Sequence, residues 1–145
     1  MGVMMAKNSF ISTCEQDTLN FANEFSKSLN KGEIILLNGD LGSGKSVFAR
    51  GVIRAFGVEK QIPSPTFTIV NEYDGKDCKL YHFDLYRLEE VEEALAIGVD
   101  EIFADENSIK LVEWPEKVWQ ILPKKVITIT IEKIDDNKRK ITVED

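Results

Sequence analysis

The sequence predicts an α/β domain in which helices flank a mixed, largely parallel sheet, so that the chain forms three layers. Short aliphatic runs alternate with segments whose apolar residues recur at helical spacing. One run, Ile34–Leu37, is apolar at every position, which is typical of a strand buried on both faces of a parallel sheet. The length of 145 residues suits one domain, and no internal repeat or linker divides it, so residues 1–145 are expected to fold as a single unit.

The first expected elements are a short strand over Ser9–Ser12 and an amphipathic helix over Glu15–Leu29. Thr13 followed by Gln16 predicts a capping box, in which each side chain satisfies a free backbone N–H at the start of the helix. Residues 30–32, Asn-Lys-Gly, then end it. The apolar residues that define the buried face of this helix are Leu19, Ala22, Phe25 and Leu29.

A strand, a glycine-rich loop and a helix follow in direct succession. The strand is expected over Glu33–Asn38 and the helix over Lys45–Phe56, with Gly57 as its terminator. This order is the structural context that a phosphate-binding loop requires, because the loop must present its backbone N–H groups at the start of a helix.

The second half of the chain predicts five more strands and one helix. The helix is expected over Glu89–Ile97 and ends at Gly98. Asp74-Gly75 predicts a hairpin turn, and Trp114-Pro115 ends the third of these strands. The strands are expected over Thr66–Tyr73, Lys79–Leu85, Ile109–Glu113 and Val126–Ile134, and Lys138–Val143 is expected to pair with the last of them.

The glycine-rich loop matches the P-loop pattern G-x-x-x-x-G-K-[ST] at every fixed position. Glycines allow backbone conformations closed to other residues, and the resulting nest of N–H groups at a helix N-terminus binds anions. A lysine in this position reaches the β- and γ-phosphates, and the following hydroxyl binds Mg²⁺. The sequence therefore predicts a P-loop NTPase-like fold that binds ATP. The predicted nucleotide-binding residues are Gly39, Asp40, Leu41, Gly42, Ser43, Gly44, Lys45 and Ser46.

Two acidic residues follow short apolar runs and are candidates for the magnesium site. Asp84 ends one predicted strand and Glu113 ends another. Ligands of open α/β sheets bind outside the carboxyl ends of the strands, so both carboxylates could face one site. Taken singly, either residue could also be an ordinary strand-end acid in solvent.

Other residues near these motifs allow two interpretations. The hydroxyl of Thr66 could sense the γ-phosphate or position a water, but it could equally bond the local backbone of its turn. His82 alternates with two aromatic residues in a strand, which favours a packed or partner-facing side chain over a ligand. We expect the arginines to be solvated or paired with acidic residues; they are Arg50, Arg54 and Arg87. We expect Trp114 and Trp119 to lie in the packed interior or at an interface.

Composition excludes several classes of function. A net charge of −7 argues against a large sequence-independent contact with nucleic acid. Two cysteines and one histidine argue against a disulfide framework and a dedicated zinc site. No apolar run approaches the length of a membrane span, and residues 1–8 contain no signal-peptide core. The simplest expectation is a cytoplasmic protein with no membrane contact.

Five motifs occur in order along the chain: GDLGSGKS at 39–46, SPTFT at 64–68, NEY at 71–73, YHFDLYRL at 81–88 and LVEWPE at 111–116. Taken together, these motifs resemble one family closely. It is the TsaE family, also called YjeE, the small P-loop ATPase of tRNA threonylcarbamoyladenosine synthesis. The phosphate loop alone is generic, whereas the combination of SPTFT, HFDLYR and VEWPE is specific.

The resemblance implies roles for individual residues. Ser46 matches the hydroxyl that binds Mg²⁺ in the family, and Glu113 matches the acidic residue at the metal. Asp84 matches a second acidic residue that the site needs, and Thr66 matches a loop threonine near the γ-phosphate. Glu15 lies in the segment that is near the nucleotide base in the family.

The resemblance also implies partners and a reaction. The family's partners are TsaB and TsaD, which build the modification on adenosine 37 of tRNAs, and the TsaE-like protein is their accessory ATPase. Slow hydrolysis of Mg-ATP is expected, because no arginine finger can be identified in the sequence. Two other readings stay open: a small kinase that uses the same loop, and a protein-binding module that responds to the bound nucleotide with negligible hydrolysis.

Overall fold

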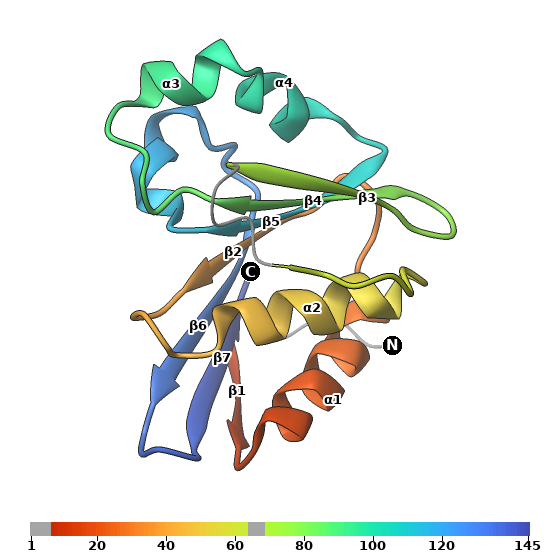
Figure 1. Cartoon of the computed structure of the whole chain (residues 1–145), viewed down its shortest axis with the longest axis vertical. Coiled ribbons are helices and arrows are strands. Elements are labelled where there is room, and N and C mark those ends of the chain that lie inside the picture. Colours follow the sequence, from red (N-terminus) through yellow and green to blue (C-terminus); the bar gives the residue numbers. More distant parts are fainter. Residues whose placement is uncertain (1–6, 64–68) are drawn as a thin grey trace.

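The computed structural model describes residues 7–63 and 69–145, which form one mixed sheet of seven strands with helices on both faces (Figure 1). The strand order is β1-β7-β6-β2-β5-β4-β3. The strands are β1 (Lys7–Ser12), β2 (Ile34–Asn38), β3 (Val70–Asp74), β4 (Lys79–Asp84), β5 (Ser108–Glu113), β6 (Ile127–Lys133) and β7 (Arg139–Glu144). The helices are α1 (Glu15–Ser26), α2 (Lys45–Ala55), α3 (Val91–Ala96), α4 (Val99–Ala104) and the 3₁₀ helix η1 (Pro115–Ile121).

The four central strands, β6, β2, β5 and β4, run parallel to one another. The outer strands are antiparallel to their neighbours: β3 pairs with β4, β7 with β6, and β1 with β7. The predicted mixed sheet is thereby confirmed, and its parallel part is the centre. Because parallel strands end at the same edge of a sheet, the ends of β2, β5 and β4 come together there.

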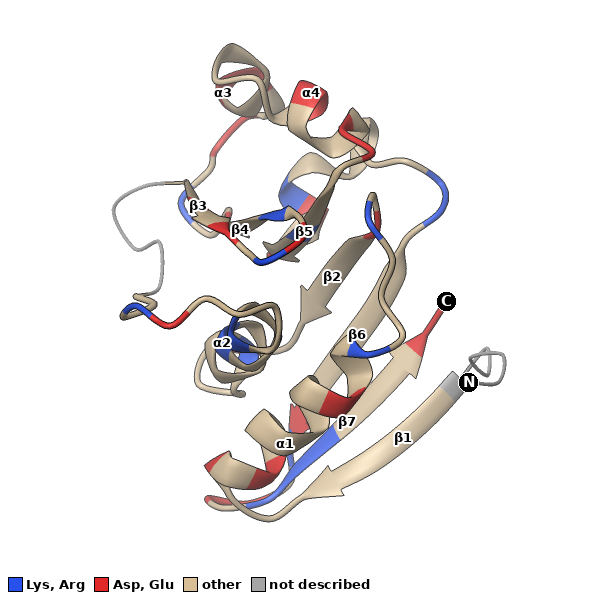
Figure 2. Cartoon of the chain, turned by 90° about the vertical axis from the view of Figure 1, so that its right-hand side faces the viewer, with Lys and Arg blue, Asp and Glu red and all other residues tan. Residues whose placement is uncertain are grey.

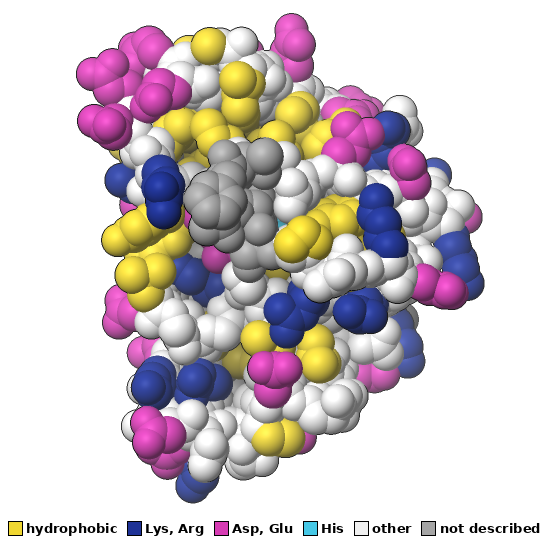
Figure 3. Space-filling model, viewed as in Figure 1, with side chains coloured by type: hydrophobic (Ala, Val, Ile, Leu, Met, Phe, Trp, Pro, Cys, Tyr) yellow, Lys and Arg dark blue, Asp and Glu magenta, His cyan; other side chains and the backbone are white. Residues whose placement is uncertain are grey.

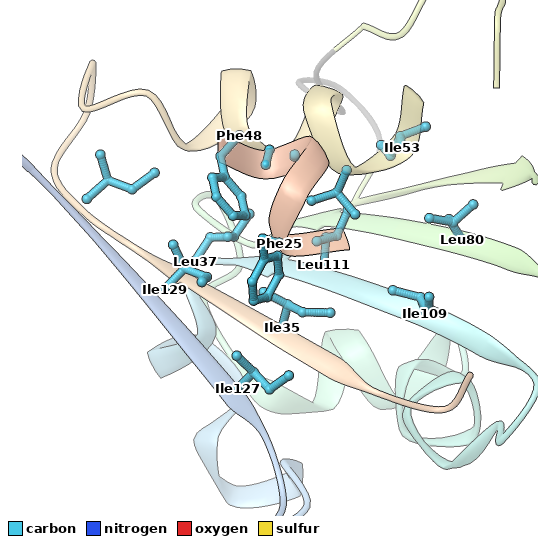
Figure 4. Packing of buried hydrophobic residues seen from close by; sticks show 14 of the residues in the cluster. Phe25, Ile35, Leu37, Phe48, Ile53, Leu80, Ile109, Leu111, Ile127 and Ile129 are labelled. Atoms are coloured by element: carbon cyan, nitrogen blue, oxygen red, sulfur yellow. The ribbon is translucent and has the colours of Figure 1, made fainter. Parts of the chain in front are cut away.

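One face of the sheet is covered by α1 and α2, which also pack on each other. Figure 4 shows Phe25 of α1 and Phe48 of α2 pointing toward strand residues that include Leu37, Leu111 and Ile129. Phe48 is fully buried, and its ring lies 5.6 Å from that of Phe25. This packing seats α2 on the end of β2 and so holds the start of α2 at the edge of the sheet.

The opposite face is covered by α3, α4 and η1, which bury a second apolar cluster. Ile34 and Leu36 belong to this cluster, whereas Ile35 and Leu37 belong to the first. The run Ile34–Leu37 is therefore buried on both faces, as its unbroken apolar pattern predicts. In β6, by contrast, buried isoleucines alternate with half-buried threonines, which suits a strand with one covered face.

The predicted capping box at the start of α1 is wrong. Cys14, not Thr13, is the N-cap residue, and it makes no side-chain capping bond. Instead, the carboxylate of Asp17 accepts hydrogen bonds from both the backbone N–H and the hydroxyl of Thr13, at 2.9 and 2.6 Å. Gln16 donates to Asn20 along the helix surface. A carboxylate accepts these bonds more strongly than an amide oxygen, so Thr13 bonds to Asp17 rather than to Gln16.

The sequence also missed two short helices in the second half. The predicted helix over 89–97 is shorter, Val91–Ala96, and a second helix starts at Val99. Gly98 separates them with a φ of 82°, so it ends one helix and is the N-cap of the next. The 3₁₀ helix η1 follows Trp114 and begins with a proline, which is favourable at a first helical position.

Gly51 marks the closest approach of α1 and α2, and it supports a stability prediction. A Cβ placed on Gly51 would lie 2.6 Å from the Cβ of Ala22. The change Gly51→Val should therefore push the helices apart and lower the free energy of unfolding by about 1–3 kcal/mol. Urea unfolding would measure this, with Arg54→Ala on the exposed face of α2 as the control. Equal stability of Gly51→Val and the wild type would contradict the close contact.

No helix among the described residues combines the length and the apolar character that crossing a membrane would need. The charged residues are unevenly placed. Asp and Glu lie on α1, α3 and α4 (Figure 2), and acidic side chains gather at the end of the molecule formed by α3 and α4 (Figure 3). The phosphate loop lies away from that acidic end, at the start of α2 (Figure 1).

Candidate phosphate-binding site

The predicted order of strand, loop and helix is confirmed, because β2 ends at Asn38 and α2 begins at Lys45. The loop between them is tightly folded. A Cβ on Gly39 would lie 2.5 Å from the Ser43 hydroxyl oxygen and 2.6 Å from the Ile131 carbonyl oxygen. Gly44 is the N-cap of α2 with a φ of 110°, a conformation that favours glycine. Both motif glycines are therefore required by the geometry of the loop.

Lys45 is nearly buried and turns back toward its own loop. Its Nζ donates a hydrogen bond to the Gly39 carbonyl at 2.6 Å and lies 3.6 Å from the ring centroid of Trp114. Burial lowers the pKa of Lys45, and the negative charges of Glu113 and Asp84 act in the opposite direction. The ammonium is thus a desolvated positive charge beside two carboxylates, ready to be attracted by an anion in the loop.

Glu113 connects the loop helix to the sheet. Its Oε2 accepts a hydrogen bond from the Ser46 hydroxyl at 3.3 Å and lies 2.6 Å from Nε2 of His82. The His82 and Glu113 side chains are 1% and 4% exposed. In this contact the His82 nitrogen donates when it carries the ring proton, and the carboxylate oxygen accepts. The predicted packed position of His82 is confirmed, and its contact with Glu113 orients that carboxylate.

Asp84 and Glu113 are direct partners in the register of β4 and β5, so their side chains lie on the same face of the sheet. Both strand-end carboxylates line the same cavity. Asp84 accepts a hydrogen bond from the backbone N–H of Tyr86 at 3.1 Å. Burial raises the pKa of Asp84, and the nearby charge of Glu113 adds to the rise, while the bond from Tyr86 opposes it.

The raised pKa of Asp84 predicts a gain in stability on Asp84→Asn. The folded state holds the Asp84 proton more tightly than the unfolded chain, so the ionised carboxylate destabilises the fold at neutral pH. Asparagine keeps an oxygen for the Tyr86 N–H and removes the charge. The thermal midpoint of Asp84→Asn should exceed that of the wild type at pH 7, and the difference should disappear below about pH 4. A variant less stable at pH 7 would contradict this.

The side chains of Lys45, Ser46, Asp84, Glu113 and Trp114 line a cavity of about 600 Å³. A smaller cavity of about 270 Å³ adjoins it, and the two share the lining residues Glu15, Gly44, Val47 and Arg139. Among the predicted site residues, those in the larger cavity are Glu15, Leu41, Gly42, Gly44, Lys45, Ser46, Asp84 and Glu113. Ser43 lines the smaller cavity, Gly39 packs closely against Ser43 and Ile131, and Asp40 is exposed. Thr66 lies outside the described residues.

The structure adds residues that the sequence did not assign to the site. Trp114 is predicted only as a packing or interface residue, yet its ring lies against Lys45 and Tyr86. Among the described residues it is the one non-glycine with positive φ, at 61°, a strained conformation for a bulky side chain. Arg139 contacts the loop from 96 positions away in the chain. Sequence offers no signal for Arg139, while Trp114 could have been suspected because it follows Glu113.

The oxygen donors suit a magnesium ion that arrives with a nucleotide. The Ser46 hydroxyl and the Glu113 carboxylate are hard ligands on neighbouring elements. Mg²⁺ takes one or two such protein ligands and completes its octahedron with waters and phosphate oxygens. Among the described residues, no group of three or more His, Cys, Asp and Glu could hold a metal ion. The arrangement thus fits a magnesium ion held jointly by the protein and the phosphates better than an ion bound by the protein alone.

Comparison with known proteins gives a consistent result. The family model "Threonylcarbamoyl adenosine biosynthesis protein TsaE" matches residues 12–141. A "tRNA threonylcarbamoyladenosine biosynthesis protein TsaE" from Rickettsia bellii is 38% identical over 138 residues, which are 94% of each chain. The protein of that name from Bacillus subtilis is 40% identical over 77% of this chain and 68% of its own. The crystal structure of Bacillus subtilis YdiB has a TM-score of 0.80 and 30% identity, covering 98% of this chain and 87% of that one.

Proposed function

Because this chain belongs to the TsaE family, we propose that it is an accessory ATPase in the threonylcarbamoyl modification of tRNA adenosine 37. It binds Mg-ATP at the loop Gly39–Ser46 and hydrolyses it slowly. The observation that carries the proposal is the convergence of Lys45, Ser46 and Glu113 on one cavity at the carboxyl edge of the sheet. That edge is where open α/β sheets place their ligands.

The proposed division of roles follows from the chemistry of each side chain. The loop N–H groups and Lys45 bind the phosphates, and Ser46 and Glu113 hold Mg²⁺, which would neutralise charge on the phosphate oxygens. His82 keeps Glu113 in place through their 2.6 Å contact. Asp84 is anchored by the backbone N–H of Tyr86 and lines the same cavity, so its proposed role is to orient water at the phosphate end. Thr66 keeps the role expected from the family motif.

The base would lie on the side of the smaller cavity. That cavity is bordered by the start of α1, with Cys14 and Glu15, and by Asp136 and Asn137 of the turn between β6 and β7. Glu15 also forms an ion pair with Arg50 at 3.7 Å. Backbone and carboxylate oxygens in this region could accept hydrogen bonds from the amino group of adenine, which is consistent with ATP as the substrate. The cytoplasmic setting stays a prediction.

We further propose that the partners are the proteins TsaB and TsaD, as the family resemblance implies, and that direct contact with tRNA is weak. Net charge supports this, since −7 disfavours the counterion-release binding that nucleic acids provide. Negatively charged proteins can still bind basic protein surfaces.

The test is phosphate release from Mg-ATP by the purified chain, alone and with TsaB and TsaD. Slow release that rises with the partners supports the accessory ATPase. Tight binding of ATP without any release, even with both partners, would instead favour a module that changes its protein contacts with the bound nucleotide. ATP consumption that depends on an acceptor, which becomes phosphorylated while no free phosphate is released, would favour the kinase reading. Absence of nucleotide binding would overturn the proposal altogether.

A further inference from the structure

The side chain of Arg139 contacts the phosphate loop through two backbone carbonyls. Its Nε donates to the Ser43 carbonyl at 2.8 Å, and one terminal nitrogen donates to the Gly42 carbonyl at 3.4 Å. Both carbonyls belong to the segment of the loop that directly precedes Lys45. Arg139 therefore binds the carbonyl oxygens of the loop, whereas the N–H groups of the loop are proposed to bind phosphate.

The other terminal nitrogen of the same guanidinium faces the turn between β6 and β7. It donates to the carbonyls of Asp135, Asp136 and Lys138, at 2.9, 3.3 and 3.2 Å. This turn and the phosphate loop lie on the same side of the molecule (Figure 1). One planar cation with five N–H donors thus joins two segments that are almost a hundred positions apart in sequence.

Peptide geometry explains why these contacts matter for an anion. In a trans peptide the C=O and the next N–H point in opposite directions, so fixing the Ser43 carbonyl on Arg139 turns the Gly44 N–H away from it. A carbonyl oxygen that faced the phosphates would repel them, and Arg139 holds two such oxygens on its own side. The loop is thereby arranged for an anion before the anion arrives, which avoids an ordering cost on binding.

We propose that Arg139 is a positioning residue that holds the phosphate loop in its anion-binding shape by clamping it to the β6–β7 turn. The inference rests on the proposed ATP binding at this loop. It assigns Arg139 no contact with the phosphates or the base.

Two rival roles for Arg139 predict different results. Arg139 lines both cavities, so it could contact the nucleoside directly. It could also act only as a positive charge near the phosphates. Tripolyphosphate separates the first rival from the clamp, because it carries the phosphates of ATP and no nucleoside. Arg139→Lys separates the second, because lysine keeps the charge but cannot span both sets of carbonyls.

The experiment is calorimetric titration of wild type, Arg139→Gln and Arg139→Lys with Mg-ATP and with Mg-tripolyphosphate. We expect both variants to lose about tenfold or more in affinity for both ligands, by the same factor for each ligand. Lys140→Gln, an exposed residue of the same strand, removes one charge and should keep the wild-type affinities. Thermal unfolding of each variant checks that the fold survives, and Arg139→Lys carries the test if Arg139→Gln does not fold.

Three outcomes would overturn the proposal. A loss for ATP with unchanged tripolyphosphate binding would assign Arg139 to the nucleoside. Wild-type affinity in Arg139→Lys would show that charge alone suffices, and unchanged affinity in both variants would show that the clamp is dispensable. Failure of the proposed function is distinguishable from these, because the wild-type chain itself would then bind neither ligand.

Discussion

Replacing Lys45 by alanine should reduce the affinity for Mg-ATP by at least about a hundredfold, the largest effect expected of any single change. Lys45 is 5% exposed, and its ammonium is held by the Gly39 carbonyl and the face of Trp114. A phosphate group offers this cation full negative charge in place of a carbonyl and a ring. The gain on binding is therefore large, and alanine forfeits it.

The fold should survive the loss of Lys45. Burial lowers the pKa of Lys45, so its charged form is disfavoured in the absence of ligand, and removing the charge relieves that cost. Lys45→Met would retain the apolar stem beside Trp114 while removing the ammonium. Fluorescence titration with a labelled nucleotide would measure the affinity of both variants, with Arg54→Ala of the same helix as the control. Near-normal affinity in Lys45→Ala would refute the assignment of the phosphate loop.

Replacing Glu113 by glutamine should reduce the rate of ATP hydrolysis by about 10²- to 10³-fold, an effect of comparable size. Glu113 is buried between Ser46 and His82, and its carboxylate is a proposed magnesium ligand. Glutamine keeps the shape and an oxygen for His82 but loses the negative charge that Mg²⁺ requires. The change therefore tests the charge of Glu113 rather than its packing.

The signature of Glu113→Gln is its dependence on magnesium. ATP affinity should be the same as in the wild type when EDTA removes the metal, and the enhancement by Mg²⁺ should be lost. Glu116→Gln makes the same change in charge three positions further on, at an exposed side chain, and should behave as the wild type. If both variants lose the magnesium effect equally, the general field of the carboxylates is responsible and the contact between Glu113 and Ser46 is not.

Local signals in the sequence were sufficient for the phosphate loop. Its glycines are required by contacts within a few residues, such as the approach of Gly39 to the Ser43 hydroxyl, and its lysine and serine occupy fixed places after them. The hairpin turn at Asp74-Gly75 was predicted correctly for the same reason, since turn chemistry depends on adjacent residues. At the start of α1, Thr13 had two possible partners, Gln16 and Asp17. The carboxylate of Asp17 is the stronger acceptor and binds both donors of Thr13, so the predicted capping box was wrong.

The two carboxylates show how far pattern alone reaches. Their positions after apolar runs predicted two strand ends, but not that β4 and β5 are neighbours with Asp84 and Glu113 in register. Strand order depends on which faces the helices cover, and that is a property of the whole sheet. The short helix α4 and the 3₁₀ helix η1 were missed because six or seven residues carry too little periodicity to stand out.

By itself, the sequence determined the α/β class, the phosphate loop, the two strand-end acids and the resemblance to the TsaE family, because each depends on residues close together in the chain. Only the tertiary structure decided that His82 supports Glu113, that the Trp114 ring receives Lys45, and that Arg139 holds the loop from the far end of the chain. Those contacts join strands, a loop and a turn that the chain brings together only on folding. Side-chain directions at such junctions follow from packing and register, which no local pattern encodes.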